Sequence, residues 1–340
     1  MKNQKKYLKV LIYLFLILNL SSCVLEKAKI EPKQKVIIYS DCLNESQINL
    51  FKKFTKKEHV KVVIINLPTD TIIKRIADQK FNTKADVILL KSLVGTNLAA
   101  KKKLFQSWKS WKMDELVPKN YKSKNNTWFA IGIDPYVFIA KNDTLATMHT
   151  IGDLLYPINI DKWSSNLETT SDLTPLIAPI LKKKTKMGAK DWFSDFIRNQ
   201  HSQNIESDEN GIPIMTTNVL LTNYTSYIKM SERNDSSDLQ LQLIFTNQNK
   251  RGAFFNAHCI GIVKQARNFN NAKLLVEYIT SAETNEKLNN YWKTFPISLH
   301  TRIHPFAYQN TYYKIASISS ERMMLKYSNL ENIISKSYKE

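Results

Sequence analysis

The sequence predicts an α/β fold, and three observations lead to this prediction. Compact runs of apolar and β-branched residues occur early in the chain, and stretches with helical spacing of apolar residues separate them. The order strand, helix, strand, helix, strand is typical of a parallel sheet covered by helices. The length of 340 residues suits two domains, or two lobes of one fold, at roughly 150 residues per domain.

The first part of the chain alternates regularly between the two kinds of element. Strands are expected at 36–39, 60–67 and 85–90, because these runs are short, apolar and bounded by polar residues. Helices are expected at 48–57 and 72–80, where apolar residues recur every three or four positions. This alternation carries the prediction of a parallel sheet.

The rest of the chain is predicted to be mixed. Residues 128–140 read as strands around a turn at Asp134-Pro135, and a helix should start after Thr150. The remaining expectations are a helix at 192–198, strands at 219–221 and 252–263, and helices at 271–279 and 282–292.

The composition excludes several classes of protein. With 43% hydrophobic and 23% charged residues the chain is globular, so disordered, collagen-like and coiled-coil interpretations fail. Three cysteines cannot build a disulfide scaffold. The seven glycines include no G-x-G-x-x-G or Walker motif, so a glycine-rich phosphate loop is excluded.

The N-terminus is typical of an export signal. A lysine-rich start is followed by an uncharged apolar run at 10–20, which is short for a membrane span. The run ends in Leu20-Ser21-Ser22-Cys23, which resembles the lipobox of bacterial lipoproteins. That resemblance implies a signal peptide at 1–22 and a lipid on Cys23. An ordinary signal peptide with a chance cysteine is the alternative.

The net charge of +19 is unusually basic for a globular protein. Removal of residues 1–22 with their four lysines leaves 45 basic and 30 acidic residues, a net charge of +15. One acyl chain and a basic surface would hold the protein on an anionic membrane leaflet. Because the chain is predicted to be exported and its lysines are scattered, we expect no nucleic-acid partner and mostly solvated lysines.

The order of several short segments carries a second resemblance. In chain order they are KVIIYS at 35–40, Phe51-Lys-Lys-Phe54, Ala85-Asp86-Val87, Trp128-Phe129-Ala130, Ile151-Gly152-Asp153-Leu154, the stretch 223–227, the stretch 251–256 and Phe295-Pro296. This set resembles the extracellular solute-binding proteins of ABC importers, in the branch that includes periplasmic ferric-iron-binding proteins. The resemblance covers nearly all of residues 35–300.

The resemblance implies a two-lobed type II periplasmic-binding-protein fold. Each lobe would be a mixed sheet flanked by helices, and hinge closure would trap a ligand in the cleft between the lobes. The expected boundaries are a signal peptide at 1–22, a tether at 23–34, lobe 1 at 35–134, lobe 2 at 135–252, a return to lobe 1 at 253–297, and C-terminal helices of lobe 2 at 298–340.

The family holds ferric iron with two neighbouring tyrosines of an Asn-x-Tyr-Tyr stretch. Here the stretch reads Asn223-Tyr224-Thr225-Ser226-Tyr227, so two residues separate the tyrosines. Ferric iron is a hard cation that phenolate and carboxylate oxygens suit. We therefore expect Tyr224 and Tyr227 as metal ligands, brought into place by a one-residue shift or a local turn. The alternative is that one or both pack as ordinary aromatic residues.

The other ligands of the iron-binding relatives are not kept. Asp41-Cys42-Leu43 stands where they often carry a histidine, Lys91 where they often carry a glutamate, and Tyr136 where they often carry an arginine. An ammonium repels a trivalent cation and suits an anion such as carbonate or phosphate. Polar residues could rebuild an oxygen-rich site in a different arrangement. The expected ligand-binding residues are Tyr39, Ser40, Asp41, Lys91, Ser92, Tyr136, Asn256 and His258.

Cys42 and Cys259 are both expected in lobe 1, near the cleft. They could be free buried thiols or a disulfide of an oxidising compartment. With His258 they could instead form a soft-metal site. The sequence leaves these three alternatives open.

The sequence therefore predicts a lipid-anchored substrate-binding protein of an ABC importer, at the periplasmic or extracytoplasmic face of the bacterial envelope. We expect a monomer without a cofactor that captures ferric iron or a ferric complex and delivers it to a permease. One alternative is a receptor for a small anion, a phosphonate or organophosphate, held by Lys91 and donors near Ser40 and Ser92. Another is a structural or partner-binding lipoprotein that lost its small ligand. Neither G-x-S-x-G nor H-E-x-x-H occurs, so nothing supports an enzyme.

Overall fold

The computed structural model describes residues 34–141, 148–167, 169–181, 184–201, 205–233, 241–297 and 313–316. Residues Gln34–Glu340 form one compact unit. The predicted signal peptide, Cys23 and nearly all of the predicted tether and of 298–340 lie outside the described residues. Within the described ranges, no helix has the length and apolar character that a membrane span requires.

Three parallel strands begin the sheet: β1 (Gln34–Ser40), β2 (Val60–Asn66) and β3 (Val87–Leu90). β1 lies in the middle, and both of its neighbours run parallel to it. The prediction of a parallel α/β arrangement from the β-branched runs is thereby confirmed. All four residues of β3 are buried, as expected for a strand covered on both faces.

Helices cover these strands. α3 (Thr69–Gln79) buries Ile72, Ile73 and Ile76, the apolar stripe that its sequence spacing predicts. The others in this part of the chain are the 3-10 helices η1 (Glu45–Phe51), η2 (Lys80–Asn82) and η3 (Lys119–Tyr121) and the α-helices α2 (Lys52–Glu58), α4 (Leu93–Lys101) and α5 (Trp111–Leu116).

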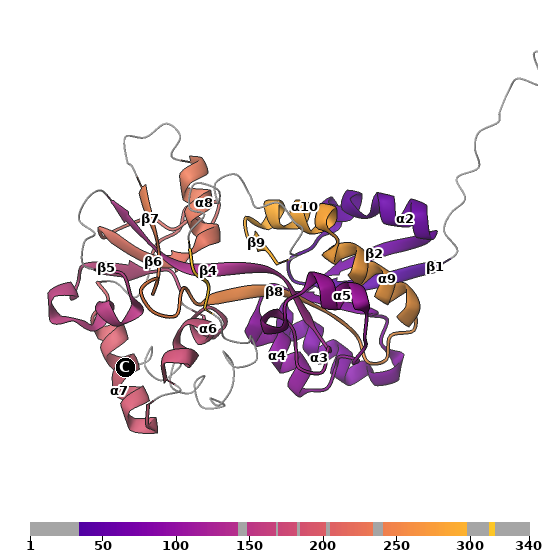
Figure 1. Ribbon diagram of the computed structural model, residues 1–340, viewed down its shortest axis with the longest axis horizontal. Coiled ribbons are helices and arrows are strands. Elements are labelled where there is room, and N and C mark those ends of the chain that lie inside the picture. Colours follow the sequence, from indigo (N-terminus) through magenta and orange to yellow (C-terminus); the bar gives the residue numbers. More distant parts are fainter. Residues whose placement is uncertain are drawn as a thin grey trace, which may run out of the picture. The chain divides into compact units, whose positions relative to one another are not determined.

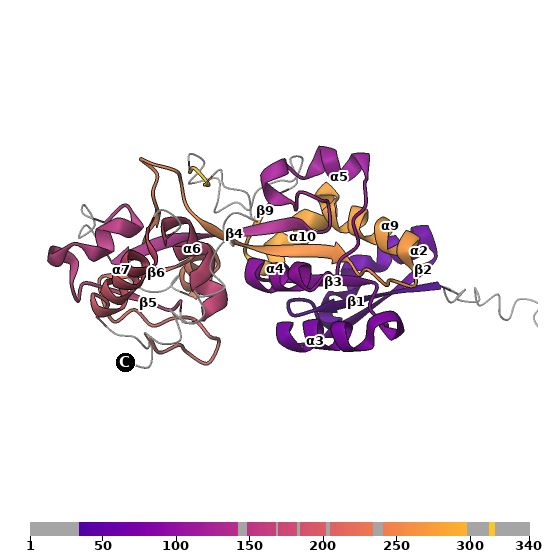
Figure 2. The same cartoon turned by 90° about the horizontal axis from the view of Figure 1, so that it is seen from below.

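The long strand β4 (Phe129–Lys141) joins the two halves of the sheet. Its first part pairs with β8 (Phe255–Ile262), and from Tyr136 onward it pairs with β6 and β7. Figure 2 shows β4 and β8 running side by side between the two groups of elements. The first half of the sheet is hereafter β2-β1-β3-β8 with the start of β4, and the second half contains β5, β6 and β7.

The prediction of a turn at Asp134-Pro135 is wrong, because both residues lie inside β4. The N–H of Tyr136 donates to the carbonyl of Phe254, which directly precedes the neighbouring strand β8, at 2.9 Å. The nitrogen of Pro135 therefore points to the opposite edge of β4. There the pairing with β9 has ended at Ile133 and the pairing with β6 has not begun. A proline, which has no N–H, costs no ladder hydrogen bond at that place.

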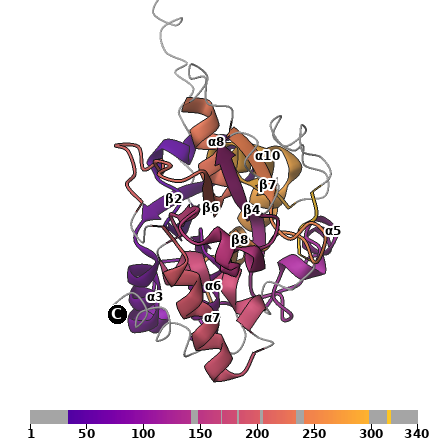
Figure 3. The same ribbon diagram turned by 90° about the vertical axis from the view of Figure 1, so that its left-hand side faces the viewer.

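The second half of the sheet contains β5 (Trp163–Ser165), β6 (Val219–Asn223) and β7 (Leu241–Phe245). Figures 1 and 3 show α8 (Tyr224–Arg233) on one side of β6 and α7 (Lys186–Arg198) on the other. The remaining helices here are α6 (Thr170–Leu181) and the 3-10 helices η4 (Ile151–Leu155) and η5 (Pro157–Asn159). The predicted helix start after Thr150 is observed, with a capping box between Thr150 and Asp153.

The chain returns to the first half through β8. It continues through α9 (Phe269–Thr280), α10 (Ala282–Trp292) and the short β9 (Phe295–Pro296). Two buried side chains of α10, Asn285 and Asn289, both donate to the carbonyl of Ile131 in β4, at 2.8 and 2.9 Å. They tie α10 to the strand that joins the halves. The sheet order is β2-β1-β3-β8-β4-β6-β5, with β7 and β9 also paired to β4.

Candidate functional site

Several of the predicted ligand residues gather where β1 and β3 end. Asp41 directly follows β1, and its carboxylate accepts the backbone N–H of Lys91 after β3 (2.8 Å) and the hydroxyl of Thr69 (2.5 Å). These contacts bind the carboxylate to the protein itself. The side chain of Lys91 is exposed, so its ammonium is available to a ligand.

Three polar side chains at this edge are occupied by the backbone. Ser40, Ser92 and Asn256 each accept two N–H groups through the side-chain oxygen. At 2.9–3.4 Å the donors are Cys42 and Leu43 for Ser40, Val94 and Gly95 for Ser92, and Leu93 and Ala257 for Asn256. The first N–H groups of α4 are thus already taken. An anion at this edge would have the Lys91 ammonium, but not the predicted backbone donors near Ser40 and Ser92.

His258 lies beside this edge as a neutral imidazole. It is 9% exposed, and its ring stacks on Trp292 with centroids 4.3 Å apart and planes 4° apart. Burial, together with the positive charge of Lys91, lowers the pKa of His258 to about 3. The Nδ1 atom is buried, and no described residue forms a hydrogen bond with it. A neutral imidazole has a lone pair on one of its two nitrogens, so His258 keeps one such donor over the whole physiological pH range.

Trp292 connects this edge to the second half of the sheet. Its indole N–H donates to the carbonyl of Cys42 at 3.1 Å, and its own carbonyl accepts the hydroxyl of Thr225 at 3.4 Å. Thr225 is the second residue of α8. The end of β1 and the N-terminus of α8 therefore both bond to Trp292, one to its side chain and the other to its backbone, although Cys42 and Thr225 are 183 positions apart in the sequence.

The two predicted tyrosine ligands begin α8. Tyr224 is 1% exposed and packs on Phe295, with ring centroids 4.3 Å apart, and on Tyr227, at 6.2 Å. Its hydroxyl is buried and has no hydrogen-bond partner among the residues that the structure describes. Burial raises the pKa of Tyr224, and the neighbouring Tyr313, Tyr227 and Asp134 raise it further. A buried, unpaired hydroxyl is costly, so it needs an explanation.

The two residues between the tyrosines occupy the third and fourth positions of the Asn-x-Tyr-Tyr stretch. The N–H of Thr225 donates to Asp134 and that of Ser226 donates to Asn223, each at 2.9 Å. Tyr224 and Tyr227 share a face of α8 because they are three residues apart. Thr225, whose hydroxyl meets Trp292, points elsewhere.

Asp134 is a candidate site residue that the sequence does not single out, because a turn is expected at Asp134-Pro135. It lies in β4 where the strand passes from one half of the sheet to the other. Burial raises its pKa to about 7; two hydrogen bonds from Thr225 and the charge of Lys229 oppose this, and Asp172 adds to it. A lone carboxylate inside an otherwise apolar strand was the signal that could have found it.

Tyr313 is a second residue that the sequence reading did not single out. Its ring stacks on Phe245, with centroids 4.4 Å apart, and contacts Phe295, at 4.8 Å. Residues 313–316 are held by a bridge between Ala253 and Ile315. Burial raises the pKa of Tyr313, and Tyr121 raises it further. Phenol groups from α8 and from the tail of the chain thus meet over Phe295.

The structure places Tyr39 and Tyr136 in the protein interior. The Tyr39 ring is 2% exposed and faces the guanidinium of Arg75, 6.0 Å from the ring centroid. Tyr136 is 1% exposed, and its hydroxyl donates to the carbonyl of Asp172 at the start of α6. Burial raises the pKa of Tyr136. Neither side chain contacts the Asp41–Lys91 edge through a hydrogen bond in the described part of the chain.

Cys42 and Cys259 are free thiols, so of the three alternatives the disulfide is not formed. Burial raises the pKa of both, that of Cys259 to about 12, so neither is a thiolate at neutral pH. Among the described residues, no three histidine, cysteine or acidic side chains are grouped so that they could hold a metal ion. The soft-metal alternative therefore has no support from the geometry.

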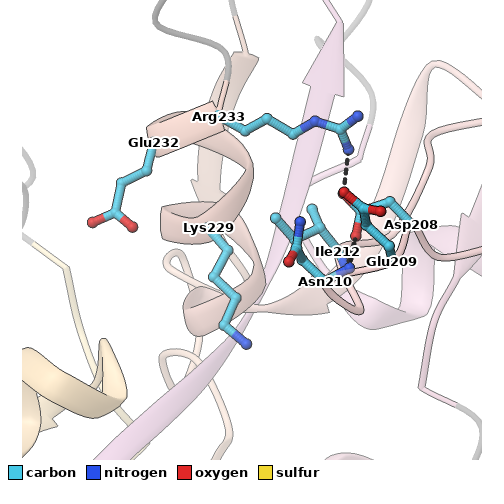
Figure 4. A pocket seen from close by; sticks show the side chains of 7 residues that line it. All are labelled: Asp208, Glu209, Asn210, Ile212, Lys229, Glu232 and Arg233. Atoms are coloured by element: carbon cyan, nitrogen blue, oxygen red, sulfur yellow. Dashed lines mark hydrogen bonds and ion pairs between the residues drawn. The ribbon is translucent and has the colours of Figure 1, made fainter.

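A pocket of about 580 Å³ lies between α8 and the loop 208–212 (Figure 4). Arg233 is paired with Asp208 across it, and the Asp208 carboxylate also accepts the N–H groups of Asn210 and Ile212. These bonds lower the pKa of Asp208. None of the predicted ligand residues lines this pocket.

Comparison with solved structures supports the fold. The chain is similar to the Trichodesmium protein IdiA (FutA) in complex with iron and citrate, with a TM-score of 0.79 and 21% identity over 89% of this chain and 99% of that one. It is also similar to the ferric binding protein from Campylobacter jejuni, with a TM-score of 0.74 and 21% identity over 89% of this chain and 97% of that one. These ferric-binding neighbours have the two-lobed periplasmic fold that the sequence predicts, so that prediction is confirmed.

Comparison of sequences also indicates a relation to iron uptake proteins. Over 274 residues the chain is 26% identical to iron uptake protein A1 of Synechocystis sp.. The aligned residues cover 76% of this chain and 75% of that protein. The family model described as bacterial extracellular solute-binding protein matches residues 82–315, more than half of the chain. Proteins of this family bind a solute for transport and catalyse no reaction. The chain belongs to the bacterial extracellular solute-binding proteins.

Proposed function

We propose that this protein captures ferric iron, as a ferric complex, and delivers it to the permease of an ABC importer while a lipid on Cys23 holds it at the membrane. The iron-uptake and ferric-binding names of its relatives support the cargo. The lipobox at 20–23 supports the anchor. The protein would work at the periplasmic or extracytoplasmic face of the envelope.

The observation that supports the cargo is the Tyr224 hydroxyl at the start of α8, which is buried and has no hydrogen-bond partner within the described part of the chain. The ring of Tyr227 lies beside that of Tyr224. The phenol of Tyr313 and the carboxylate of Asp134 are near enough to raise the pKa of Tyr224. Hard oxygen donors of this kind suit ferric iron. Tyr224 and Tyr227 supply the phenolates, and Asp134 is a further oxygen donor at the joint between the halves.

The cargo is a complex rather than the bare cation because Lys91 is close enough to lower the pKa of His258, whose ring stacks on Trp292. An ammonium repels iron and attracts the carboxylates that accompany it. The related Trichodesmium protein holds iron together with citrate. A ferric carboxylate complex would satisfy both the phenols and Lys91. Because the Tyr224 hydroxyl is buried, iron can reach it only when the ring contact between Tyr224 and Phe295 opens. Movement of two lobes about a hinge allows such an opening.

The test is a visible absorption titration of residues 24–340 with ferric citrate. A tyrosinate-to-iron charge-transfer band should appear, and it should be weakened in Tyr224→Phe and in Tyr227→Phe and lost in the double variant. Tyr156→Phe is the matched control, because Tyr156 is 58% exposed in a loop and should leave the band unchanged. A band that persists in the double variant would refute this ligand set.

Lys91 favours a second candidate, a receptor for a small anion. With the N–H groups of α4 already bonded, this site would depend on the ammonium alone, which makes it weaker than the sequence predicts. Absence of a band together with thermal stabilisation by phosphate or a phosphonate, lost in Lys91→Ala, would favour it. No response to either ligand would favour a partner-binding lipoprotein.

A further inference from the structure

The segment 101–124 carries an unusual share of the positive charge. It contains eight lysines, no arginine and two acidic residues, a net charge of +6 within 24 residues. It runs from the end of α4 through α5 and η3 toward β4. Figure 2 shows α5 at the outer edge of the first half. No part of the proposed iron site uses this segment.

The segment has a fixed conformation, so its lysines have a defined placement. Phe105 forms a bridge with Val263, and the N–H of Gln106 donates to the carbonyl of Ile262 at 2.9 Å. The apolar side chains of the segment are buried: Leu104, Phe105, Trp108, Met113 and Val117. With the apolar side inward, the lysines face solvent. The exposed ones are Lys101, Lys102, Lys103, Lys109, Lys112, Lys119 and Lys124.

Few of these charges are neutralised. Lys122 pairs with Asp114, and Lys112 lies 3.5 Å from Glu277 of α9. Within the part of the chain that the structure describes, five lysines of the segment have no ion-pair partner: Lys101, Lys102, Lys103, Lys109 and Lys119. Like charges close together repel one another, and an anionic surface would reduce that repulsion.

Trp111 is the exception among the tryptophans. It is 73% exposed in the first turn of α5, and the ammonium of Lys112 lies 5.9 Å from its ring centroid. The other five tryptophans of the chain, all within the described ranges, are at most 8% exposed. An exposed indole among lysines matches the interface of an anionic membrane, where tryptophan sits at headgroup depth and lysine attracts anionic lipids.

We propose that Trp111 with Lys109, Lys112 and Lys119, hereafter the basic surface, docks on the anionic lipid headgroups of the membrane to which the chain is tethered. This inference is independent of the iron site and rests on the proposed lipid anchor only for proximity. A tether of eleven residues from Cys23 to Lys33 spans at most about 40 Å. That length keeps the local lipid concentration high, so weak contacts suffice.

The absence of arginine favours lipid over nucleic acid. Arginine is the residue that reads phosphates and base edges with its planar fork, whereas lysine acts as a point charge that suits a diffuse anionic surface. The export signal also separates the chain from nucleic acid.

The test uses residues 24–340, which contain the whole compact unit and lack the lipidated cysteine. The protein is mixed with vesicles of phosphatidylcholine alone or with phosphatidylglycerol, and the bound fraction is measured by sedimentation. Binding is expected only with phosphatidylglycerol and should weaken with salt. Lys109→Ala with Lys119→Ala should lower the partition coefficient about 25-fold, about fivefold per lysine. Lys52→Ala with Lys56→Ala removes the same charge from α2 and should change it far less.

Tryptophan fluorescence gives an independent readout. Since Trp111 alone is exposed, vesicle binding should shift the emission to the blue and reduce quenching by acrylamide, and Trp111→Ser should lack both changes. Equal binding to phosphatidylcholine, equal loss in both double variants, or binding that leaves Trp111 quenchable would overturn the proposal. Binding to RNA with no vesicle binding would overturn it as well.

Discussion

Replacement of Asp134 by asparagine should stabilise the protein above about pH 8 and leave it unchanged near pH 4. Asparagine keeps the side-chain oxygen that accepts the N–H of Thr225, so the hydrogen bond at 2.9 Å can persist. What disappears is the ionisable group. Burial raises the pKa of Asp134 from 3.8 to about 7, so the ionised form is disfavoured in the folded protein.

The sign and size follow from that shift. Between about pH 4 and pH 7 the folded protein keeps a proton that the unfolded chain releases, so stability is lost as the pH rises through this window. Three pKa units correspond to about 4 kcal/mol. Because Asp134 keeps some solvent contact, we expect about 2–4 kcal/mol in favour of Asp134→Asn at alkaline pH.

Urea unfolding at several pH values measures this difference. Wild type and Asp134→Asn should coincide near pH 4 and separate progressively up to about pH 8. Asp78→Asn, an exposed carboxylate on α3, is the matched control and should follow the wild type throughout. If Asp134→Asn is the less stable protein at alkaline pH, the ionised carboxylate stabilises the N-terminus of α8 and the reasoning from burial is wrong.

Three further outcomes follow from the same geometry. Binding of iron by two phenols displaces two protons, so the affinity for ferric citrate should fall about 100-fold for each pH unit of acidification. In Tyr224→Phe one phenol remains, so the fall should be about tenfold for each pH unit. Competition titration at several pH values measures both slopes. Gly261→Ala should lower stability by more than about 2 kcal/mol in urea, because a Cβ there would meet Phe105 at 2.5 Å; an unchanged midpoint would contradict this. Asn289→Ala should cost about 1–3 kcal/mol by leaving Ile131 with one donor, and equal midpoints would refute the tie between α10 and β4.

Local sequence patterns sufficed to predict the helices and strands in which the apolar spacing and the flanking residues indicate the same element. The predicted helix at 282–292 has the bounds of α10, because its apolar stripe and its flanking residues agree. The three parallel strands were likewise visible as β-branched runs. The prediction of a turn at Asp134-Pro135 was wrong for a reason that lies in the tertiary structure. A proline can continue a strand where the strand changes neighbours, and nothing local records that change.

The candidate site was predicted less well, because side-chain direction decides it. The spacing of Tyr224 and Tyr227 shows that they share a helix face but not which way that face points. Only the fold reveals that it meets Phe295 and Tyr313 from later in the chain. The same holds for Ser92, whose oxygen is used by the helix that it begins.

The joint between the halves contains two groups that the fold alone would not favour. The Tyr224 hydroxyl is buried with no partner in the described ranges, and the Asp134 carboxylate is buried enough to raise its pKa to about 7. Each lowers the stability of the empty protein. A phenylalanine and an asparagine would fill the same space at lower cost, which is the reason that the proposed function assigns both oxygen-bearing groups to the ligand. On that proposal, a ferric complex would give the Tyr224 hydroxyl a partner and would neutralise the Asp134 carboxylate, which already accepts the N–H of Thr225. The stability cost of these two groups and the affinity for the ferric complex would then have one origin.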